Sequence, residues 1–353
     1  MIELARPPRI VSVGTANPPT TYTQQEILDL FRCEDPKIRQ FFTASHIRQR
    51  HLVLPRPLPD GSVPDEDGAA LLDKHLRTSL EIGRDAVERC LAGAAFERQE
   101  IGFFVAVTST GFLCPGLSAY IAQTCALPRN MHRVDVLGMG CNAGVNGLVA
   151  AAQFASANPG RPALLLCCEA CSAAYVFDDS LRTSVVNSLF GDGAAAVLVV
   201  APAAPKPLEG PELLGFEPFV VHEARDEMRF DFEDGRFSFY LGWEIPYLIG
   251  EHIATPVTIL LAHFGLKRRD IRHWIVHSGG KKVIDAIKYN IGITEYDVRH
   301  TRSILRDYGN MSSASVFFSY QQLLREGIAE PGDLGVLIGM GPGVSIETGL
   351  LRW

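Results

Sequence analysis

Apolar runs of strand length alternate along the chain with longer runs of helical periodicity. RIVSVGTA at residues 9–16 reads as a buried strand, and GAALLDKHLRTSLEIGRDAVERCLAG at residues 68–93 has its apolar positions at helical spacing. IGFFVAVTST at 101–110 and GLSAYIAQTCAL at 116–127 repeat this order of strand and helix. Alternation of this kind is typical of buried sheets covered by helices, so the pattern predicts an α/β fold.

Prolines and alanines interrupt the alternation in APAAPKPLEGPELL at residues 201–214. We therefore expect two lobes, residues 1–205 and 206–353. Each lobe has a small-residue loop leading into a helix, LGMGCNAGVNGLVAAAQFA in the first and DYGNMSSASVFFSYQQLL in the second. An internal duplication would explain this likeness, which is too faint to establish one.

Composition changes this picture only by excluding some classes of protein. The chain has 353 residues, 47% of them hydrophobic, and a formal net charge of -7. A large core is therefore expected, and a general nucleic-acid binder is disfavoured, although a local basic patch would still suit a phosphorylated small molecule. We see no signal-peptide pattern and no apolar run of ~18 residues, so we expect a cytoplasmic protein outside the membrane with reduced cysteines.

Two short patterns invite a metal reading. Cys168-x-x-Cys171 has the spacing of half a zinc site, but no second pair of ligands follows at a suitable distance. His273 and His277 lie in the strand-like run HWIVH, where residues four apart are separated by roughly 13 Å. We expect no metal site.

Cys141 lies between small residues, where a strand-like run gives way to a helix-like one. A buried cysteine is usually a small packing residue. Here, however, the N–H groups and dipole at the start of a helix near Asn142 would stabilise a thiolate and lower the thiol pKa. Gly138, Gly140 and Gly144 would let the backbone bend and a substrate approach, so Cys141 is a candidate nucleophile.

A thiolate nucleophile needs a proton partner. Of the ten histidines, His277 alone ends a strand-like run and precedes two glycines and a helix, so its ring could project from a sheet edge. Asn310 lies in a third polar loop, before the helix SASVFFSYQQLLREG. Taken by itself, this asparagine could equally be a turn or capping residue.

The order Cys, His, Asn on these loops is typical of a known enzyme family. GCNAGVNGL, NSLFGDGAAAV, HWIVHSGGKKVIDAI, YGNMSSASVFF and GMGPGVSIE together resemble the type III polyketide synthases of the thiolase superfamily, nearly end to end. Within that family, HSGGKKVIDAI, EACSAAYVFD, RTSVVNSLFGDG and RFSFYL resemble the bacterial 3,5-dihydroxyphenylacetyl-CoA synthases, whereas chalcone and stilbene synthases typically carry HPGG.

This resemblance implies a fold and a chemistry. It implies a thiolase-like five-layered αβαβα fold of two similar halves, a homodimer, and no metal or organic cofactor. Cys141 would attack a CoA thioester, helped by an ion pair with His277. His277 and Asn310 would then stabilise the enolate left by decarboxylation of malonyl-CoA, and the product would be a longer acyl-CoA.

The resemblance also assigns residues around the substrate. Phe190 and Phe239 match positions that act as gatekeepers, although phenylalanine is a common core residue. Arg48 and Arg50, in HIRQRH, align with a segment that meets CoA phosphates in relatives, although a surface charge cluster is often only solvated. Cys114 matches a residue that reaches into the partner's cavity, where plant relatives typically have methionine.

The same residues are compatible with other functions. Another type III synthase would use a fatty or aryl starter in place of malonyl-CoA. A ketoacyl-ACP synthase III shares the Cys, His, Asn order but would typically show HQAN, and this chain has HSGG and GMGPG. A non-catalytic protein on the same fold would have no need of the triad.

Overall fold

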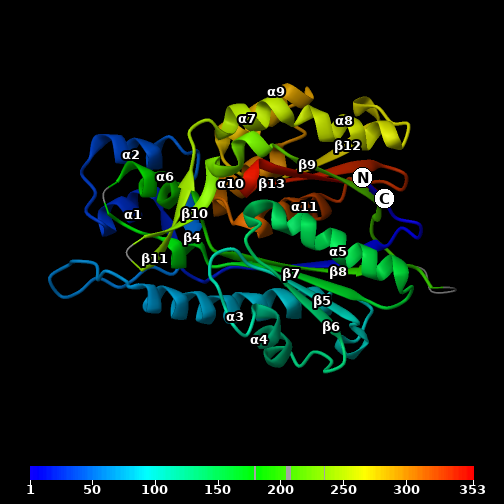
Figure 1. Cartoon of the computed structure of the whole chain (residues 1–353), viewed down its shortest axis with the longest axis horizontal. Coiled ribbons are helices and arrows are strands. Elements are labelled where there is room, and N and C mark those ends of the chain that lie inside the picture. Colours follow the sequence, from blue (N-terminus) through cyan, green and yellow to red (C-terminus); the bar gives the residue numbers. More distant parts are fainter. Residues whose placement is uncertain (179, 204–207, 234) are drawn as a thin grey trace.

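Two halves of a large sheet and three layers of helices alternate through the molecule (Figure 1). The computed structural model describes residues 1–178, 180–203, 208–233 and 235–353. Within them, one half of the ten-stranded sheet is β2 (Arg9–Ala16), β8 (Gly193–Val200), β7 (Ala163–Glu169), β5 (Phe103–Val107) and β6 (His132–Val136), in that order. The other half is β9 (Glu212–Val220), β14 (Ser345–Arg352), β13 (Leu334–Gly341) and β12 (Ile271–Val276), with β1 (Ile2–Glu3) beside β9.

Only one residue pair, Arg9 with Glu212, joins β2 to β9 in register, so the sheet acts as two stacked halves. Between the halves lie α5 (Ala143–Ala157) and α11 (Ser315–Glu326). The outer layers are α3 (Gly68–Ala92) with α4 (Leu117–Thr124), and α7 (Ile245–His252) with α8 (Ala254–His263) and α9 (Lys281–Ile291) (Figure 1). The five-layered αβαβα fold is thus confirmed.

The central strands are buried on both faces, because helices cover both sides of the sheet. Every residue of β7 and β8 is buried, which explains the uninterrupted apolar runs ALLLCCE and GAAAVLVV. The segments that resemble each other in the two lobes form the starts of α5 and α11, the two central helices.

The remaining elements gather at one end of the layers, at the left of Figure 1. They are α1 (Gln24–Leu30), α2 (Pro36–Thr43), α6 (Leu181–Leu189), α10 (Arg299–Tyr308), the pair β3 (Thr21–Thr23) and β4 (Gln49–His51), and the hairpin of β10 (Met228–Glu233) and β11 (Arg236–Leu241). Short 3-10 helices are η1 (Arg98–Glu100), η2 (Gly140–Asn142), η3 (Cys171–Ala174), η4 (His222–Glu227), η5 (Arg268–Asp270), η6 (Ser312–Ala314) and η7 (Pro342–Val344).

The strands and helices expected from periodicity are present. RIVSVGTA forms β2, IGFFVAVTST contains β5, and the two helical patterns form α3 and α4. The helix expected near Asn142 begins at Ala143 after η2. The expected boundary between residues 205 and 206 lies outside the described residues.

Residues Ile245–His263, which contain α7 and α8, are long and apolar enough to cross a membrane by length and composition. Polar residues interrupt this stretch, so it is not a continuous apolar run of ~18 residues. In the fold, the buried side of α8, with Val257, Leu260 and Leu261, packs against β9 and β14, so the apolar face of this helix is used within the chain.

Candidate active site

Cys141 stands at the sharp bend between β6 and α5. Gly138 and Gly140 on either side of Met139 have φ of +75° and +58°, a region that favours glycine. A Cβ on Gly140 would lie 2.4 Å from Cδ of Pro342, so the bend also packs tightly on the end of β13. Cys141 itself is 7% exposed and lines a pocket.

Gly144 serves a different purpose from the expected one. A Cβ at this position would lie 2.3 Å from the backbone oxygen of Ser313. The glycine therefore lets the start of α5 approach the start of α11, and it is this backbone, rather than a substrate, that comes close. The two central helices thereby bring Cys141 and Asn310 together.

Asn310 faces the nucleophile. Its Oδ1 accepts the Ser312 N–H at 2.8 Å, and the Sγ of Cys141 lies 3.9 Å from Nδ2 and 4.0 Å from Oδ1. Because Oδ1 is already bonded in the turn, Nδ2 is the free donor beside the sulfur. Asn310 is 2% exposed, and Ser312 adopts a φ of +48°, a strained conformation for a residue with a side chain. The turn interpretation of Asn310 is confirmed by Oδ1, and Nδ2 leaves a donor near the sulfur, so the catalytic role stays a prediction.

His277 follows β12, and its backbone N–H donates to Ile338 O at 2.9 Å. The Oγ of Ser278 donates to Gly309 O at 3.4 Å, which ties the His277 loop to the Asn310 loop. His277 is 1% exposed, and its Nδ1 has no hydrogen-bond partner among the described residues. No hydrogen bond between His277 and Cys141 is present among the described residues, so their ion pair stays a prediction.

Burial opposes charge on both groups. It raises the pKa of the Cys141 thiol to about 12, against the opposing effect of hydrogen bonds from Ser312 and Asn310, and lowers the pKa of the His277 imidazole to about 3. The expectation that the helix start lowers the pKa of Cys141 is wrong for the thiol taken alone, because desolvation outweighs the helix N–H groups. A thiolate here requires that the proton pass to His277.

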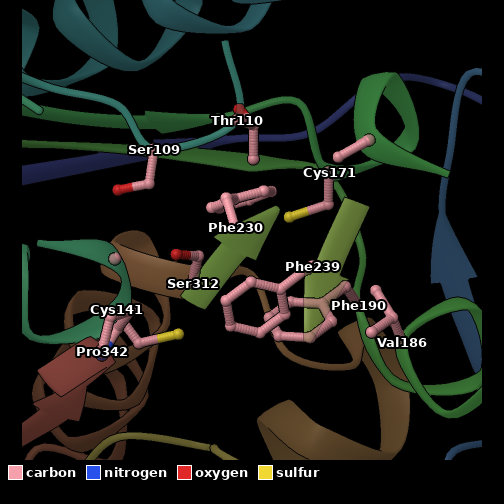
Figure 2. Close-up of a pocket in the computed structure, with 12 residues that line it drawn as sticks. Ser109, Thr110, Cys141, Cys171, Val186, Phe190, Phe230, Phe239, Ser312 and Pro342 are labelled. Atoms are coloured by element: carbon pink, nitrogen blue, oxygen red, sulfur yellow. The ribbon is translucent and has the colours of Figure 1, made fainter. Parts of the chain in front are cut away.

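Figure 2 shows the pocket into which the sulfur of Cys141 points. The empty space between its walls, counted together with space open to solvent, is about 390 Å³, and its lining is mostly apolar. Phe190 and Phe239 meet edge to face with ring centroids 5.6 Å apart, and Phe230 lies 4.9 Å from Phe239. The two predicted phenylalanines therefore do line the pocket that holds the candidate nucleophile. The other lining residues are Ser109, Thr110, Gly140, Cys171, Ala174, Val186, Ser312 and Pro342.

Sequence reasoning missed part of this wall. Cys171 is buried, as expected, but its sulfur points into the pocket across from Cys141 (Figure 2). Phe230 was also missed, although it pairs with Phe239 across the β10–β11 hairpin, where residues opposite each other share a face. That cross-strand register is the signal that would have found it.

A buried carboxyl group lies behind the pocket. Glu169, at the end of β7, accepts the Ser109 N–H at 2.9 Å and the hydroxyl of Ser313. Burial raises its pKa to about 7, and its charge raises the pKa of Cys141 further. Nothing in the sequence distinguishes this glutamate from a surface one, because its burial depends on the packing of both lobes.

Arg48, just before β4, and Arg50, within it, lie in different environments. Arg48 is largely exposed, and its guanidinium pairs with Asp307 at 3.1 Å, near the end of α10. Arg50 is fully buried and donates to protein oxygens, so the expectation that it meets a CoA phosphate is wrong.

The cysteines and histidines tested for metal binding have other partners. His273 Nε2 contacts Asp333 at 2.8 Å, and Cys168 Sγ lies against Ser79 O in the core. Across residues 1–178, 180–203, 208–233 and 235–353, no group of three or more His, Cys, Asp or Glu side chains is placed to hold a metal ion. Cys114 lies on an exposed loop and does not line the pocket.

A cysteine at a helix start, with a histidine and an asparagine from the second lobe in a five-layered αβαβα fold, defines a thiolase-fold condensing enzyme. The chain matches the family models of chalcone and stilbene synthases, the N-terminal domain over residues 4–203 and the C-terminal domain over residues 220–353. It therefore belongs to the chalcone and stilbene synthase family and is a type III polyketide synthase, an acyltransferase, as its motifs indicated.

Individual relatives agree with this assignment. The chain is 51% identical to the 3,5-dihydroxyphenylacetyl-CoA synthase of Streptomyces toyocaensis, over 98% of this chain and 90% of that one. It is 47% identical to the synthase of the same name from Amycolatopsis balhimycina, over 98% and 93% of the two chains. The crystal structure of 1,3,6,8-tetrahydroxynaphthalene synthase from Streptomyces coelicolor A3(2), a bacterial type III polyketide synthase, superposes with a TM-score of 0.89 at 26% identity, covering 98% of this chain and 99% of that one.

Proposed function

We propose that the chain condenses four malonyl-CoA molecules into 3,5-dihydroxyphenylacetyl-CoA. The observation that carries this proposal is the 51% identity to a synthase of that name over 98% of the chain.

Loading begins with Cys141. As its sulfur attacks the thioester carbonyl, the thiol proton passes to His277 and then to the departing sulfur, so that free CoA leaves and an acyl-Cys141 thioester remains. The high pKa of the buried thiol makes this proton acceptor necessary. His277 is neutral because burial lowers its pKa, and the negative charge that develops on the sulfur would raise the basicity of the imidazole enough for it to accept the proton.

Extension uses the same pocket. Malonyl-CoA loses carbon dioxide, and the electron pair of the broken bond becomes an enolate whose oxygen takes hydrogen bonds from Asn310 Nδ2 and the imidazole of His277. The enolate carbon then attacks the acyl-Cys141 carbonyl, a carbon–carbon bond forms, and the cysteine sulfur leaves. Four malonyl units would give an eight-carbon chain, which closes by carbon–carbon bond formation, with loss of one water, to a resorcinol ring bearing an acetyl-CoA arm.

Phe190 and Phe239 would shape the growing chain, since both line the pocket next to Cys141. Arg48 would meet a CoA phosphate, because its guanidinium is at the surface close to the loop that carries Asn310. Arg48→Glu should then raise the KM for malonyl-CoA and leave kcat nearly unchanged, as measured by steady-state kinetics.

We also propose that the chain works as a homodimer in the cytoplasm, with Cys114 reaching toward the partner's cavity. The exposed loop before α4 carries Phe112, which is 62% exposed, and β6 ends the described sheet with one unpaired edge. Sedimentation of the purified protein at micromolar concentration tests this, and a monomer would contradict it.

One incubation tests the proposed product. Purified protein with isotopically labelled malonyl-CoA, and no other acyl-CoA, should yield 3,5-dihydroxyphenylacetyl-CoA by mass spectrometry. A triketide pyrone alone, with a longer product only after a fatty or aryl starter is added, would assign the chain to another starter. Condensation that requires an acyl carrier protein would indicate a ketoacyl-ACP synthase III. If no acyl-CoA is turned over at all, the chain would be a non-catalytic protein on the same fold.

A further inference from the structure

A fully buried arginine, Arg50, lies behind the wall that connects the pocket to Asn310. Its guanidinium is 0% exposed. Among the residues that the structure describes, its hydrogen-bond partners are neutral and no carboxylate forms a direct ion pair with it. Burial lowers its pKa, against the opposing charges of Tyr175, Asp192 and Cys171. A buried charge without a direct ion-pair partner is costly, and a neutral side chain would fill the same space at less cost.

What the guanidinium supplies is several donors in a fixed geometry. Nη1 donates to Asn187 O at 2.6 Å, to Phe190 O at 2.8 Å and to the Tyr175 hydroxyl at 2.7 Å. Nη2 donates to Gln24 Oε1 at 2.6 Å, and the amide nitrogen of Gln24 donates in turn to Ser188 O at 2.8 Å. The carbonyls of residues 187, 188 and 190, which lie at the end of α6, are therefore all held by Arg50 or by its partner.

The positive charge of Arg50 lies at the C-terminal end of α6, where a cation is stabilising. The last carbonyls of a helix have no partner inside the helix and carry the negative end of its dipole, which a cation stabilises. The hydroxyl of Tyr175 also donates to Phe190 O, so two donors fix the carbonyl of a residue whose ring lines the pocket.

The same segment is hydrogen-bonded to Asn310. Asn310 N–H donates to Leu189 O at 2.9 Å, and Gly191 N–H donates to Asn310 O at 3.0 Å, so residues 190 and 310 form a parallel bridge. The side chain of Arg50 also packs against the backbone before Asn310, because a Cβ on Gly309 would lie 2.8 Å from its Cδ. Arg50 thus contacts the backbone on both sides of the bridge.

We propose that Arg50 is a positioning residue that fixes the Phe190–Asn310 bridge, and through it the distance between the Asn310 amide and the sulfur of Cys141. The proposal rests on the proposed function, in which Asn310 stabilises the enolate. A shift of the bridge moves the Nδ2 donor away from the developing oxyanion. It leaves the binding of malonyl-CoA and the access of small reagents to Cys141 largely unchanged.

Arg50→Lys tests this, since lysine keeps the charge but cannot hold both sides of the network. We expect kcat for carbon dioxide release from malonyl-CoA to fall at least about tenfold, because small displacements of a catalytic group have effects of this size or larger. KM should change by less than about threefold, and the rate at which iodoacetamide labels Cys141 should stay within about twofold of wild type.

Arg98→Lys is the matched control. Arg98 Nη1 donates to Cys125 O at the end of α4, the same kind of helix-end contact, but it lies before β5, whereas the pocket residues Ser109 and Thr110 follow that strand. Its kcat should match wild type. A kcat of Arg50→Lys within about twofold of this control, an effect on KM alone, or equal losses of labelling and decarboxylation would overturn the proposal.

Tyr175→Phe covers the case in which Arg50→Lys does not fold. It removes one of the two donors to Phe190 O and leaves the guanidinium in place, so we expect the same pattern with a loss of about threefold in kcat. Unchanged kcat in this variant would then count against the proposal. If wild-type protein itself releases no carbon dioxide from malonyl-CoA, it is the proposed function that fails.

Discussion

The sharpest prediction concerns Asn310→Ala. In the structure, Oδ1 makes the turn by accepting the Ser312 N–H, while Nδ2 is the donor beside the Cys141 sulfur. Alanine removes both functions. Loss of one oxyanion donor costs roughly 3 kcal/mol in the transition state, which corresponds to roughly a hundredfold lower rate of decarboxylation. The orphaned Ser312 N–H should cost a further ~1–3 kcal/mol of unfolding free energy.

Two assays separate these effects. Release of labelled carbon dioxide from carboxyl-labelled malonyl-CoA measures the chemical step, and the intact mass of the protein after a short incubation with an acyl-CoA measures loading of Cys141. We expect the first to fall about a hundredfold while loading continues. Asn158→Ala is the control, because Asn158 Nδ2 donates to Phe154 O at the far end of α5. Decarboxylation within a few-fold of wild type in Asn310→Ala would refute the donor role.

Sequence and structure agree most closely where local geometry decides the outcome. The bend at Cys141, the strand before His277 and the loop before Asn310 were predictable, because glycines and apolar runs specify them locally. The family motifs predicted that the loops of Cys141, His277 and Asn310 come together. This depends on how the two lobes stack, for which the sequence has no local signal.

Burial accounts for the predictions that were wrong. Arg50 and Arg48 look alike in the sequence, and only the tertiary packing of β4 shows that one is a core residue. For Cys141, complete desolvation opposes the expected effect of the helix start on the thiol pKa, so a low apparent pKa at this site depends on proton transfer to His277. Cys171 and Glu169 were missed for the same reason, since the side chains that surround them come from distant segments.

Three further predictions follow from the site. The pH profile of iodoacetamide labelling should give wild-type Cys141 an apparent pKa below ~8.5. His277→Ala should raise this apparent pKa toward that of the isolated buried thiol, whereas the control His273→Ala should leave it unchanged. Identical profiles in wild type and His277→Ala would rule out the Cys141–His277 ion pair. Phe239→Leu should broaden the range of chain lengths in the product, read by mass spectrometry. Tyr240→Leu is the control, because Tyr240 lies on the other face of the same strand, against the Arg229 guanidinium, and should leave chain length unchanged. Burial raises the pKa of Glu169 to about 7, so the folded state holds a proton that the unfolded state loses above about 4.5. The contribution of Glu169 to the free energy of unfolding therefore falls as pH rises from 4.5 to 7. Glu169→Gln should flatten that decline by up to about 3 kcal/mol in denaturant titrations, and an unchanged slope would contradict the raised pKa.

The central claim is that Cys141 carries the growing chain in the pocket it shares with Cys171. The most direct measurement is to mix wild-type protein with malonyl-CoA, stop the reaction in acid within seconds, digest the protein, and locate acyl adducts by mass spectrometry. Burial raises the pKa of Cys171 well above that of a free thiol, and among the described residues it has no α-helix start and no Asn310 amide beside it, so it should stay unmodified. We predict polyketide adducts on the peptide containing Cys141 and none on the peptide containing Cys171. Adducts on Cys171, or carbon dioxide release and product formation with Cys141 unmodified, would contradict the account.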